Sequence, residues 1–379
     1  MLTTRFDIRD EIRFFEGIKA RFPQIAPDFS KSLNIAVVGK VGSGKRSLIN
    51  AILKRSRKDV VAKVGVQPKS DRELQSLKLD ERLSIIISTR FDDNSLASSD
   101  IKQQAKYQFD VGILLVNGTA NASQNKDIYK LKQSCQSIFV VLNKLDELHD
   151  LQFTDLNKVL KAWKQNLQVK KIYPVSTFGY DLKNQYHTKL AIQKVYRLRE
   201  DIEFVLATKG KDLLLAPHMG QKKTSAKTII AKALSSVAIQ AFLPDNITYI
   251  AATQTAAISA LYYLYRGEVL SLPSCLSILS TLAQAGNNKN FFTFISSIFP
   301  GAGLVNIESA GVTAMSITLA LLVTINSIWE TGKTVEEDQR LPLRLRIYTK
   351  KAELTFKKIK PSQLTDRLVL QKILDEFIL

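Results

Sequence analysis

The chain has 379 residues, of which 45% are hydrophobic, so it is long enough for about two or three domains with ordinary cores. Its formal net charge of +19 favours an acidic partner, which could be anionic lipid, nucleic acid or a phosphorylated ligand. Because its two cysteines, Cys135 and Cys275, lie far apart, the sequence excludes a disulfide framework and a cysteine-rich metal site, and it favours a reducing compartment.

The first 32 residues are expected to form an N-terminal segment with one amphipathic helix. Between residues 6 and 22, apolar side chains recur at nearly helical spacing at Ile8, Ile12, Phe15 and Ile18. Two prolines in the run FPQIAPDFSKS are expected to end this helix. Charged residues interrupt the apolar ones throughout, so we expect no signal peptide.

Residues 33–206 alternate apolar strands with helices. This alternation predicts an α/β fold with a mostly parallel sheet covered by helices on both faces. The apolar runs VGILLV and IFVVL have the composition of strands buried on both sides. The expected strands are 35–38, 74–79, 83–88, 111–116, 138–142 and 171–175, and the expected helices are 45–53, 124–135, 153–167 and 192–206.

A glycine-rich loop follows the first of these strands and opens the first helix. It matches the P-loop pattern G-x-x-x-x-G-K-[ST] at Gly39, Gly44 and Lys45. Backbone N–H groups of such a loop converge on phosphate oxygens, and the helix N-terminus adds a partial positive charge. We expect phosphate binding, with an ordinary tight strand–turn–helix as the alternative. The phosphate-binding residues would be Gly39, Lys40, Val41, Gly42, Ser43, Gly44, Lys45, Arg46 and Ser47.

A second motif, Asn143-Lys144-Leu145-Asp146, directly follows the expected strand IFVVL. A carboxylate only accepts hydrogen bonds, and guanine offers two adjacent donors on its Watson–Crick edge, whereas adenine offers no such pair. Asp146 is therefore expected to select guanine. The alternative is that these four residues form an ordinary surface turn.

In these motifs and their order, residues 33–206 resemble a Ras-like P-loop GTPase domain. The run YPVSTFGYD resembles the loop that backs the base, so the resemblance implies base binding by Asn143, Lys144, Asp146, Ser176 and Thr177. VGVQPKSDRE resembles the first switch, with Ser70 in the place of the family's threonine. More closely, the chain is similar to immunity-related GTPases and to bacterial GTPases with an apolar, all-α domain behind the G domain. The resemblance implies GTP or GDP as ligand, and it allows a homodimer formed through the G domain.

Three positions depart from the family pattern, and all three serve the metal and the γ-phosphate. Arg46 stands in place of the hydroxyl that ligates magnesium, Ser88 in place of an aspartate and Phe91 in place of a glycine. The residues expected to hold phosphate and base remain. The sequence therefore leaves magnesium in doubt, indicates no metal ligands or catalytic residue, and predicts a pseudo-GTPase with weak or absent hydrolysis.

Three outcomes stay open at this site, so whether the chain is an enzyme stays open too. In the favoured one Arg46 replaces magnesium, because a guanidinium can bind phosphate through two parallel hydrogen bonds. In the second Arg46 points outward or the site is empty, and the fold is a scaffold. In the third Asp92 or Asp93 replaces the lost aspartate in an active GTPase. Ser47 does not restore the hydroxyl, because one helical position turns a side chain by about 100°.

The second half of the chain changes in composition. Residues 207–227 are basic and broken by glycine and proline, which predicts a linker. Residues 228–335 are apolar, with helices expected at 228–242, 247–265 and 310–329. The last could span a membrane by its length, but its small and polar residues suit a bundle core equally well. We favour a bundle that docks on or dips into a membrane over a spanning helix or a soluble bundle.

Residues 336–379 form a basic segment with apolar residues at Leu345, Leu354, Phe356 and Ile359. Basic residues beside apolar helices attract anionic lipid, and no nucleic-acid-binding module accompanies them, so we expect lipid and no nucleic acid. The alternative is a solvated helix face. The expected membrane-binding residues are Arg344, Arg346, Lys350, Lys351, Lys357, Lys358 and Lys360. The protein is expected at the cytoplasmic face of a membrane, peripheral or partly embedded, as an adaptor or in membrane remodelling, with a nucleotide-free scaffold as the alternative.

Overall fold

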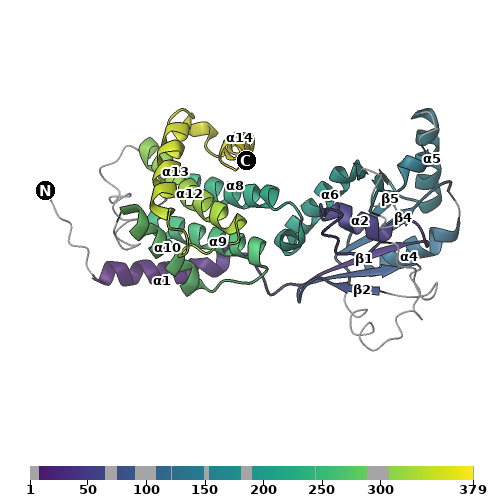
Figure 1. Ribbon diagram of the computed structural model, residues 1–379, viewed down its shortest axis with the longest axis horizontal. Helices are drawn as coiled ribbons and strands as arrows, with labels where there is room; N and C mark the ends of the chain where they lie inside the picture. Colours follow the sequence, from purple (N-terminus) through teal and green to yellow (C-terminus); the bar gives the residue numbers. More distant parts are fainter. Residues whose placement is uncertain are drawn as a thin grey trace. The chain divides into compact units, whose positions relative to one another are not determined.

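The computed structural model describes residues 8–64, 75–89, 108–120, 122–148, 153–180, 190–243, 245–287 and 307–378. The chain divides into two compact units. The α/β unit is Asp28–Gln221, and the helical unit combines the chain up to Pro27 with the chain from Lys222 onward (Figure 1). An α/β unit followed by an apolar all-α region confirms the predicted fold class.

The α/β unit is built on a six-stranded sheet in the order β2-β3-β1-β4-β5-β6. β2 runs antiparallel to β3, and the other neighbouring strands are parallel. The strands are β1 (Leu33–Gly39), β2 (Gln75–Lys78), β3 (Leu83–Ser88), β4 (Val111–Val116), β5 (Ile138–Leu142) and β6 (Tyr173–Pro174). Every residue of β4 is buried, which fits a parallel sheet covered on both faces.

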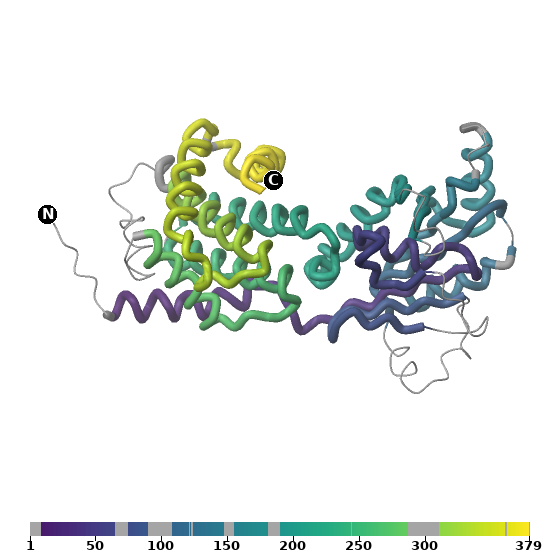
Figure 2. Tube along the Cα trace, in the orientation of Figure 1, coloured from purple at the N-terminus to yellow at the C-terminus, as the bar shows by residue number. Residues whose placement is uncertain are grey.

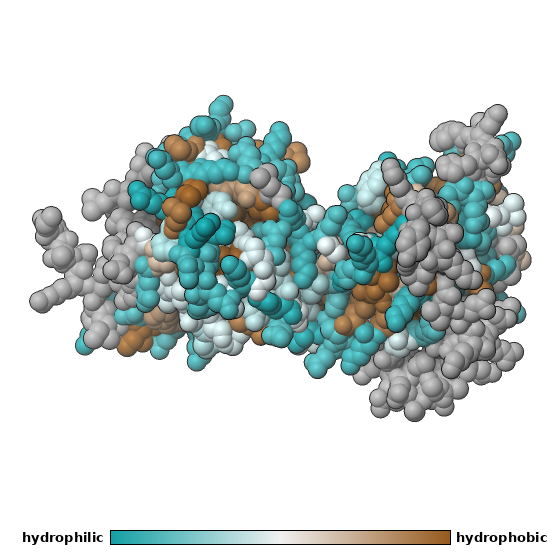
Figure 3. All heavy atoms as spheres, viewed as in Figure 1, coloured by the Kyte–Doolittle hydropathy of each residue, from teal (hydrophilic) through white to brown (hydrophobic). Residues whose placement is uncertain are grey.

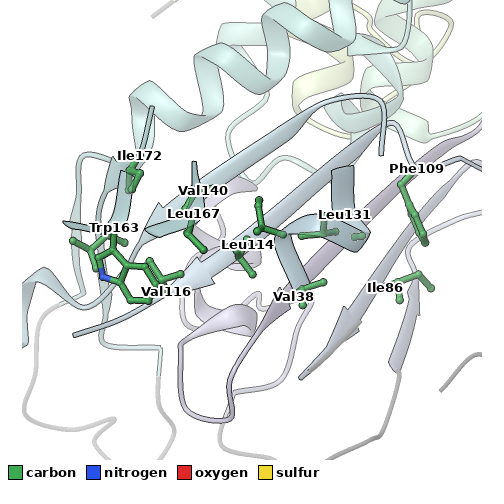
Figure 4. Packing of buried hydrophobic residues seen from close by; sticks show 13 residues of the cluster. Val38, Ile86, Phe109, Leu114, Val116, Leu131, Val140, Trp163, Leu167 and Ile172 are labelled. Atoms are coloured by element: carbon green, nitrogen blue, oxygen red, sulfur yellow. The ribbon is translucent and has the colours of Figure 1, made fainter. Parts of the chain in front are cut away.

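One face of this sheet packs on α4 (Asn125–Ser134) and α5 (Phe153–Leu167). Alternate strand residues such as Val38, Leu114 and Val140 point to this face and form one core with side chains of the two helices (Figure 4). Trp163 of α5 is fully buried there, and its indole N–H donates to the Gly118 carbonyl at 2.9 Å. The one polar group of this buried tryptophan, its indole N–H, is therefore hydrogen-bonded inside the core.

The remaining helices of the α/β unit are α2 (Lys45–Ile52), which contacts β1, and α6 (Val195–Thr208), which contacts β6. Arg199 of α6 donates to the carbonyls of Ala51 and Ile52 at 2.8 and 2.7 Å. These carbonyls lie in the last turn of α2, where helical partners run out. The shorter elements are η2 (Ala122–Gln124), η3 (Leu145–Leu148), and the antiparallel pair β7 (Ser176–Phe178) and β8 (Ala191–Gln193).

The segment predicted as a linker differs in the structure. Up to Gln221 it belongs to the α/β unit and contains α7 (Asp212–Leu215) and η5 (Ala216–His218). Leu214 and Leu215 are buried, and the Lys211 ammonium lies 2.6 Å from the buried carboxylate of Asp110. Basic residues with glycine and proline suggested a linker, but buried leucines and an ion pair to a buried carboxylate attach this segment to the unit.

The helical unit contains seven described α-helices. They are α1 (Ile8–Ile25), α8 (Lys223–Gln240), α9 (Asn246–Arg266), α10 (Leu272–Asn287), α12 (Ile307–Glu330), α13 (Leu341–Phe356) and α14 (Arg367–Phe377), with a 3-10 turn, η6, at Pro361–Gln363. α12 contacts α8, α9 and α13, so it lies at the centre of the bundle. Two of its polar side chains have partners on α9: Gln254 donates to the Thr318 hydroxyl at 2.9 Å, and Tyr265 donates to Asn326 at 2.8 Å.

The N-terminal helix is part of this bundle rather than a separate segment. α1 lies alongside α9, where the purple and green tubes run together (Figure 2). Its buried apolar residues are Phe14 and Ile18, whereas Ile12, expected on the apolar face, is 53% exposed. The helix continues to Ile25 and includes Pro23 in its last turn, contrary to the expected end before this proline.

A methyl group on Gly17 of α1 would lie 2.5 Å from the Thr248 methyl of α9, so this glycine permits the close contact between the two helices. Arg21 of α1 also lies 3.0 Å from the Asp245 carboxylate and over the Tyr249 ring. The partner helix thus decides which face of α1 is buried.

One helix among the described residues is long and apolar enough to cross a membrane, at Gly311–Glu330 in α12, with a mean hydropathy of 1.7. Within that window 78% of the residues are buried in the protein. Burial of this extent is what the core helix of a bundle requires. On the face shown in Figure 3, the helical unit mixes hydrophobic and hydrophilic residues.

Candidate nucleotide-binding site

The glycine-rich loop connects β1 to α2 in a conformation that its glycines permit. Gly42 and Gly44 have φ angles of 77° and 91°, which other residues rarely adopt. A Cβ on Gly39 would lie 2.7 Å from the Leu115 carbonyl oxygen, and one on Gly44 would lie 2.3 Å from the Asn143 amide nitrogen. Because Gly44 is the N-cap of α2, no cap side chain competes for the first N–H groups of this helix.

Lys45, the first residue of α2, folds back over the loop. Its ammonium donates to the carbonyls of Gly39 and Lys40 at 2.6 and 2.9 Å. Burial, and after it the charge of Arg46, lowers the pKa of Lys45 to about 8. Lys40 and Val41 themselves are exposed at the outer side of the loop.

The NKLD motif lies directly beside this loop. Asn143 follows β5, and its buried amide donates to the Ser43 carbonyl at 2.9 Å. The same amide group accepts a hydrogen bond from the Thr177 hydroxyl at 3.2 Å. Asn143 thus connects three segments that lie far apart in the sequence, and the structure brings together the phosphate and base residues expected there.

Asp146 lies in η3, with Ser176 of β7 as its hydrogen-bond donor. The backbone before it turns sharply, because Lys144 has a φ of 66° and the Leu145 N–H donates to the Val175 carbonyl. The Lys144 ammonium pairs with Glu147 at 2.5 Å. Asp146 is half-buried, so one carboxylate oxygen is positioned by Ser176 and its side chain is still accessible to solvent.

Two residues that sequence reasoning did not select hold the chain that follows α2. Asn50 of α2 is fully buried, accepts from the N–H groups of Val61 and Ala62 at 3.1 Å, and donates to the Ala62 carbonyl. Tyr180 donates to the Arg55 carbonyl at 2.7 Å. Both tie the chain that follows α2 to the rest of the unit. An asparagine inside the apolar run SLINAIL was the available signal for the first.

The positions that depart from the family pattern lie partly in the described chain. The Arg46 guanidinium donates to the side-chain oxygen of Gln75 on β2 at 2.5 Å. Ser88 ends β3 and is buried, and Ser47 follows Arg46 in α2. Ser70 and Phe91, like Asp92 and Asp93, lie outside the described residues. The contact with Gln75 neither requires nor excludes a phosphate, so the phosphate contact of Arg46 stays a prediction.

The doubt about magnesium stays a prediction. At the two described positions, Arg46 carries a permanent positive charge and Ser88 carries no negative charge, and neither residue favours a cation. Two features leave room for a phosphate: no atom lies within 4 Å of the position that a Cβ on Gly42 would take, and the buried Ser43 hydroxyl has no hydrogen-bond partner.

The α/β unit combines four features: its sheet order, the antiparallel strand β2, the glycine loop between β1 and α2, and the NKLD motif after β5. This is the fold of a P-loop GTPase domain. The α/β unit, Asp28–Gln221, therefore carries its motif residues at the carboxyl ends of β1 and β5, where ligands of open α/β sheets bind.

No protein-family model and no curated protein matches the chain. Among solved structures, it is similar to a probable GTP-binding protein, engB, at 16% identity over 46% of this chain and 99% of that one, with a TM-score of 0.29. The G domain of the FeoB iron transporter from T. maritima has 17% identity over 46% and 98% of the two chains, with a TM-score of 0.28. Era from Aquifex aeolicus has 17% identity over 55% and 68%, with a TM-score of 0.29.

The basic residues expected to bind membranes lie on α13 and the turn after it. Arg344 is half-buried and paired with Asp338 at 2.9 Å, and the Lys351 ammonium donates to the Glu376 carbonyl at 2.6 Å. Leu345 and Phe356, two of the apolar residues expected beside these basic ones, are both buried in the bundle. The exposed basic residues are Arg346, Lys350, Lys351, Lys357, Lys358 and Lys360.

Proposed function

We propose that this protein is a guanine-nucleotide-binding protein of the membrane surface that hydrolyses GTP slowly or not at all. The observation that carries the nucleotide part is the buried Asn143 amide, which joins the phosphate loop to the base-binding motif. A glycine-rich loop that binds no ligand would not need this connection. A nucleotide contacts the loop with its phosphates and the NKLD motif with its base, so its binding requires a constant distance between these two segments.

The residues of the two motifs divide the contacts to the nucleotide among them. The N–H groups from Gly42 to Lys45 bind the phosphates, assisted by the Lys45 ammonium. The Asp146 carboxylate accepts two hydrogen bonds from guanine, and Ser176 orients it. Arg46 exchanges its hydrogen bond with Gln75 for one with a phosphate, since a charged acceptor gives the stronger bond.

Slow hydrolysis follows from the same residues. Metal-assisted transfer of a γ-phosphate depends on a hydroxyl and a carboxylate near the ion, and this chain has Arg46 and Ser88 at those positions. An arginine can hold phosphate charge without activating a water. The nucleotide would then act as a long-lived ligand that keeps the protein in one state, as suits an adaptor.

The first experiment measures binding of fluorescent GDP and GTP by the full chain, with magnesium and with EDTA. We expect binding that EDTA leaves unchanged in the wild type, and magnesium dependence in Arg46→Ser. A wild type that binds no nucleotide in either condition would sink the proposal. Steady phosphate release above background, lost in Lys45→Ala, would instead establish an active GTPase.

A matched variant tests the base contact independently of folding. In Asp146→Asn an amide N–H replaces one acceptor, so it opposes a guanine donor but pairs with the carbonyl of xanthine. We expect this variant to lose GDP and to bind xanthosine diphosphate. Loss of GDP without gain of xanthosine diphosphate would mean that Asp146 does not contact the base.

The membrane part of the proposal is supported by charge and surface composition. The chain carries a net charge of +19, and the basic residues of its C-terminal segment are mostly exposed. Anionic lipid at the cytoplasmic face of a membrane would attract such a segment. Because α12 is largely buried, the proposal is a peripheral attachment of the folded bundle rather than a spanning helix.

A further inference from the structure

We propose that one face of α13 is the membrane-docking surface of this protein and lies in the plane of an anionic bilayer. This inference rests on the membrane part of the proposed function and is independent of nucleotide binding. It concerns three apolar residues, Leu343, Ile347 and Leu354, here called the α13 stripe. These side chains are 57%, 53% and 54% exposed.

The α13 stripe is a single line on the helix. Its residues are 4 and 7 positions apart, spacings that return a helical side chain to nearly the same direction. The opposite direction belongs to residues that are buried in the bundle, Leu341, Leu345, Ala352 and Phe356. α13 is therefore apolar on two opposite sides, and only one of these sides is covered by the protein.

Basic residues accompany the stripe. By helical geometry, Arg346 and Lys350 lie along one border of it, and Lys357 and Lys358 follow at the C-terminal end of the helix; all four are exposed. The acidic residue of α13 is Glu353, at the edge of that border. An apolar line with cations beside it is the composition of helices that lie at a lipid interface, with the apolar side chains among the acyl chains and the cations among the headgroups.

This composition favours a lipid surface over nucleic acid. Phosphate contacts of a nucleic acid would use the cations but would leave three large apolar side chains in water. An anionic bilayer satisfies both sets at once. Between the stripe and the buried side, two side chains of α13 already contact the C-terminal helix: Tyr348 packs near Phe377, and the Lys351 ammonium lies over the Phe377 ring.

The test is co-sedimentation of the full chain with vesicles of phosphatidylcholine, with and without phosphatidylserine. We expect the wild type to bind only when phosphatidylserine is present. The paired changes Lys350→Glu with Lys357→Glu, and Ile347→Ser with Leu354→Ser, should each lower the affinity by at least about tenfold. These residues are exposed, so folding should be unaffected, which circular dichroism can verify.

Two control variants match these changes on the α/β unit. Lys161→Glu with Lys164→Glu alters two exposed lysines of α5, and Phe204→Ser alters a side chain of α6 that is 70% exposed. We expect both to bind vesicles as the wild type does. An equal loss of binding in the lysine control would mean diffuse attraction by the net charge and would overturn the proposal.

A fluorescent reporter tests the location directly. Both natural tryptophans, Trp163 and Trp329, are buried, so Ile347→Trp adds an exposed indole whose emission should shift to the blue when phosphatidylserine vesicles are added. Binding of the protein without this shift would assign docking to another surface. No binding to either vesicle would overturn the inference and the membrane part of the function, while the nucleotide experiments would be unaffected.

Discussion

At the scale of single residues, the phosphate loop depends on Lys45, which is held against loop carbonyls and has a pKa of about 8. In the free protein this lysine is charged below that pH and neutral above it. Bound phosphate favours the charged form and raises the pKa again. The affinity for nucleotide should therefore be highest and nearly constant well below pH 8, and it should decline as the pH rises above about 8.

Between about pH 7 and about pH 8.5 we expect the affinity for GDP to fall by roughly fourfold, as linkage to a group with this pKa requires. Titrations of the protein with fluorescent GDP at the two pH values measure this fall in affinity. Guanosine, which has no phosphate, is the matched control and should show no such decline. An unchanged GDP affinity would mean that Lys45 does not meet the phosphates.

At the scale of elements, α1 shows how a tertiary contact selects one face of a helix. Ile18 is fully buried, whereas Ile12 on the same helix is 53% exposed. Ile18→Ala should lower the free energy of unfolding by about 2–5 kcal/mol, because it leaves a cavity in the bundle. Ile12→Ala should change it by less than about 0.5 kcal/mol.

Urea denaturation followed by circular dichroism compares these two variants of α1. If the two variants are equally stable, Ile18 of α1 is not packed in the bundle.

Tertiary contacts also account for polar residues of the central helix α12. Its Thr318 and Asn326 accept hydrogen bonds from side chains of α9 inside the bundle.

At the scale of the whole molecule, the two units have separate cores, and the proposed nucleotide site lies within one of them. A ligand stabilises only the unit that binds it, by about 2.7 kcal/mol at a hundredfold excess over Kd. Calorimetry should therefore show GDP raising one unfolding transition and leaving the other unchanged. In Asp146→Asn, GDP should raise neither transition. A wild type whose two transitions rise together would contradict the assignment of the site to one unit.

The sequence by itself determined the α/β architecture, the phosphate loop and the NKLD motif. These depend on local patterns: an apolar strand, glycines at a set spacing, and a short motif directly after a strand. The departures at Arg46 and Ser88 were equally visible, because they are substitutions within such patterns.

Only the tertiary structure decided which partners those residues have. Contacts between distant segments decide four features: the bond from Asn143 to Ser43, the contact of Arg46 with Gln75, the buried face of α1, and the inclusion of residues 207–221 in the α/β unit. Hydrophobic periodicity in a sequence shows that one face of a helix is apolar, but it does not show which segment packs on that face. Of the apolar residues in the basic segment, Leu345 and Phe356 are buried by the bundle, whereas Leu343 and Ile347 remain exposed.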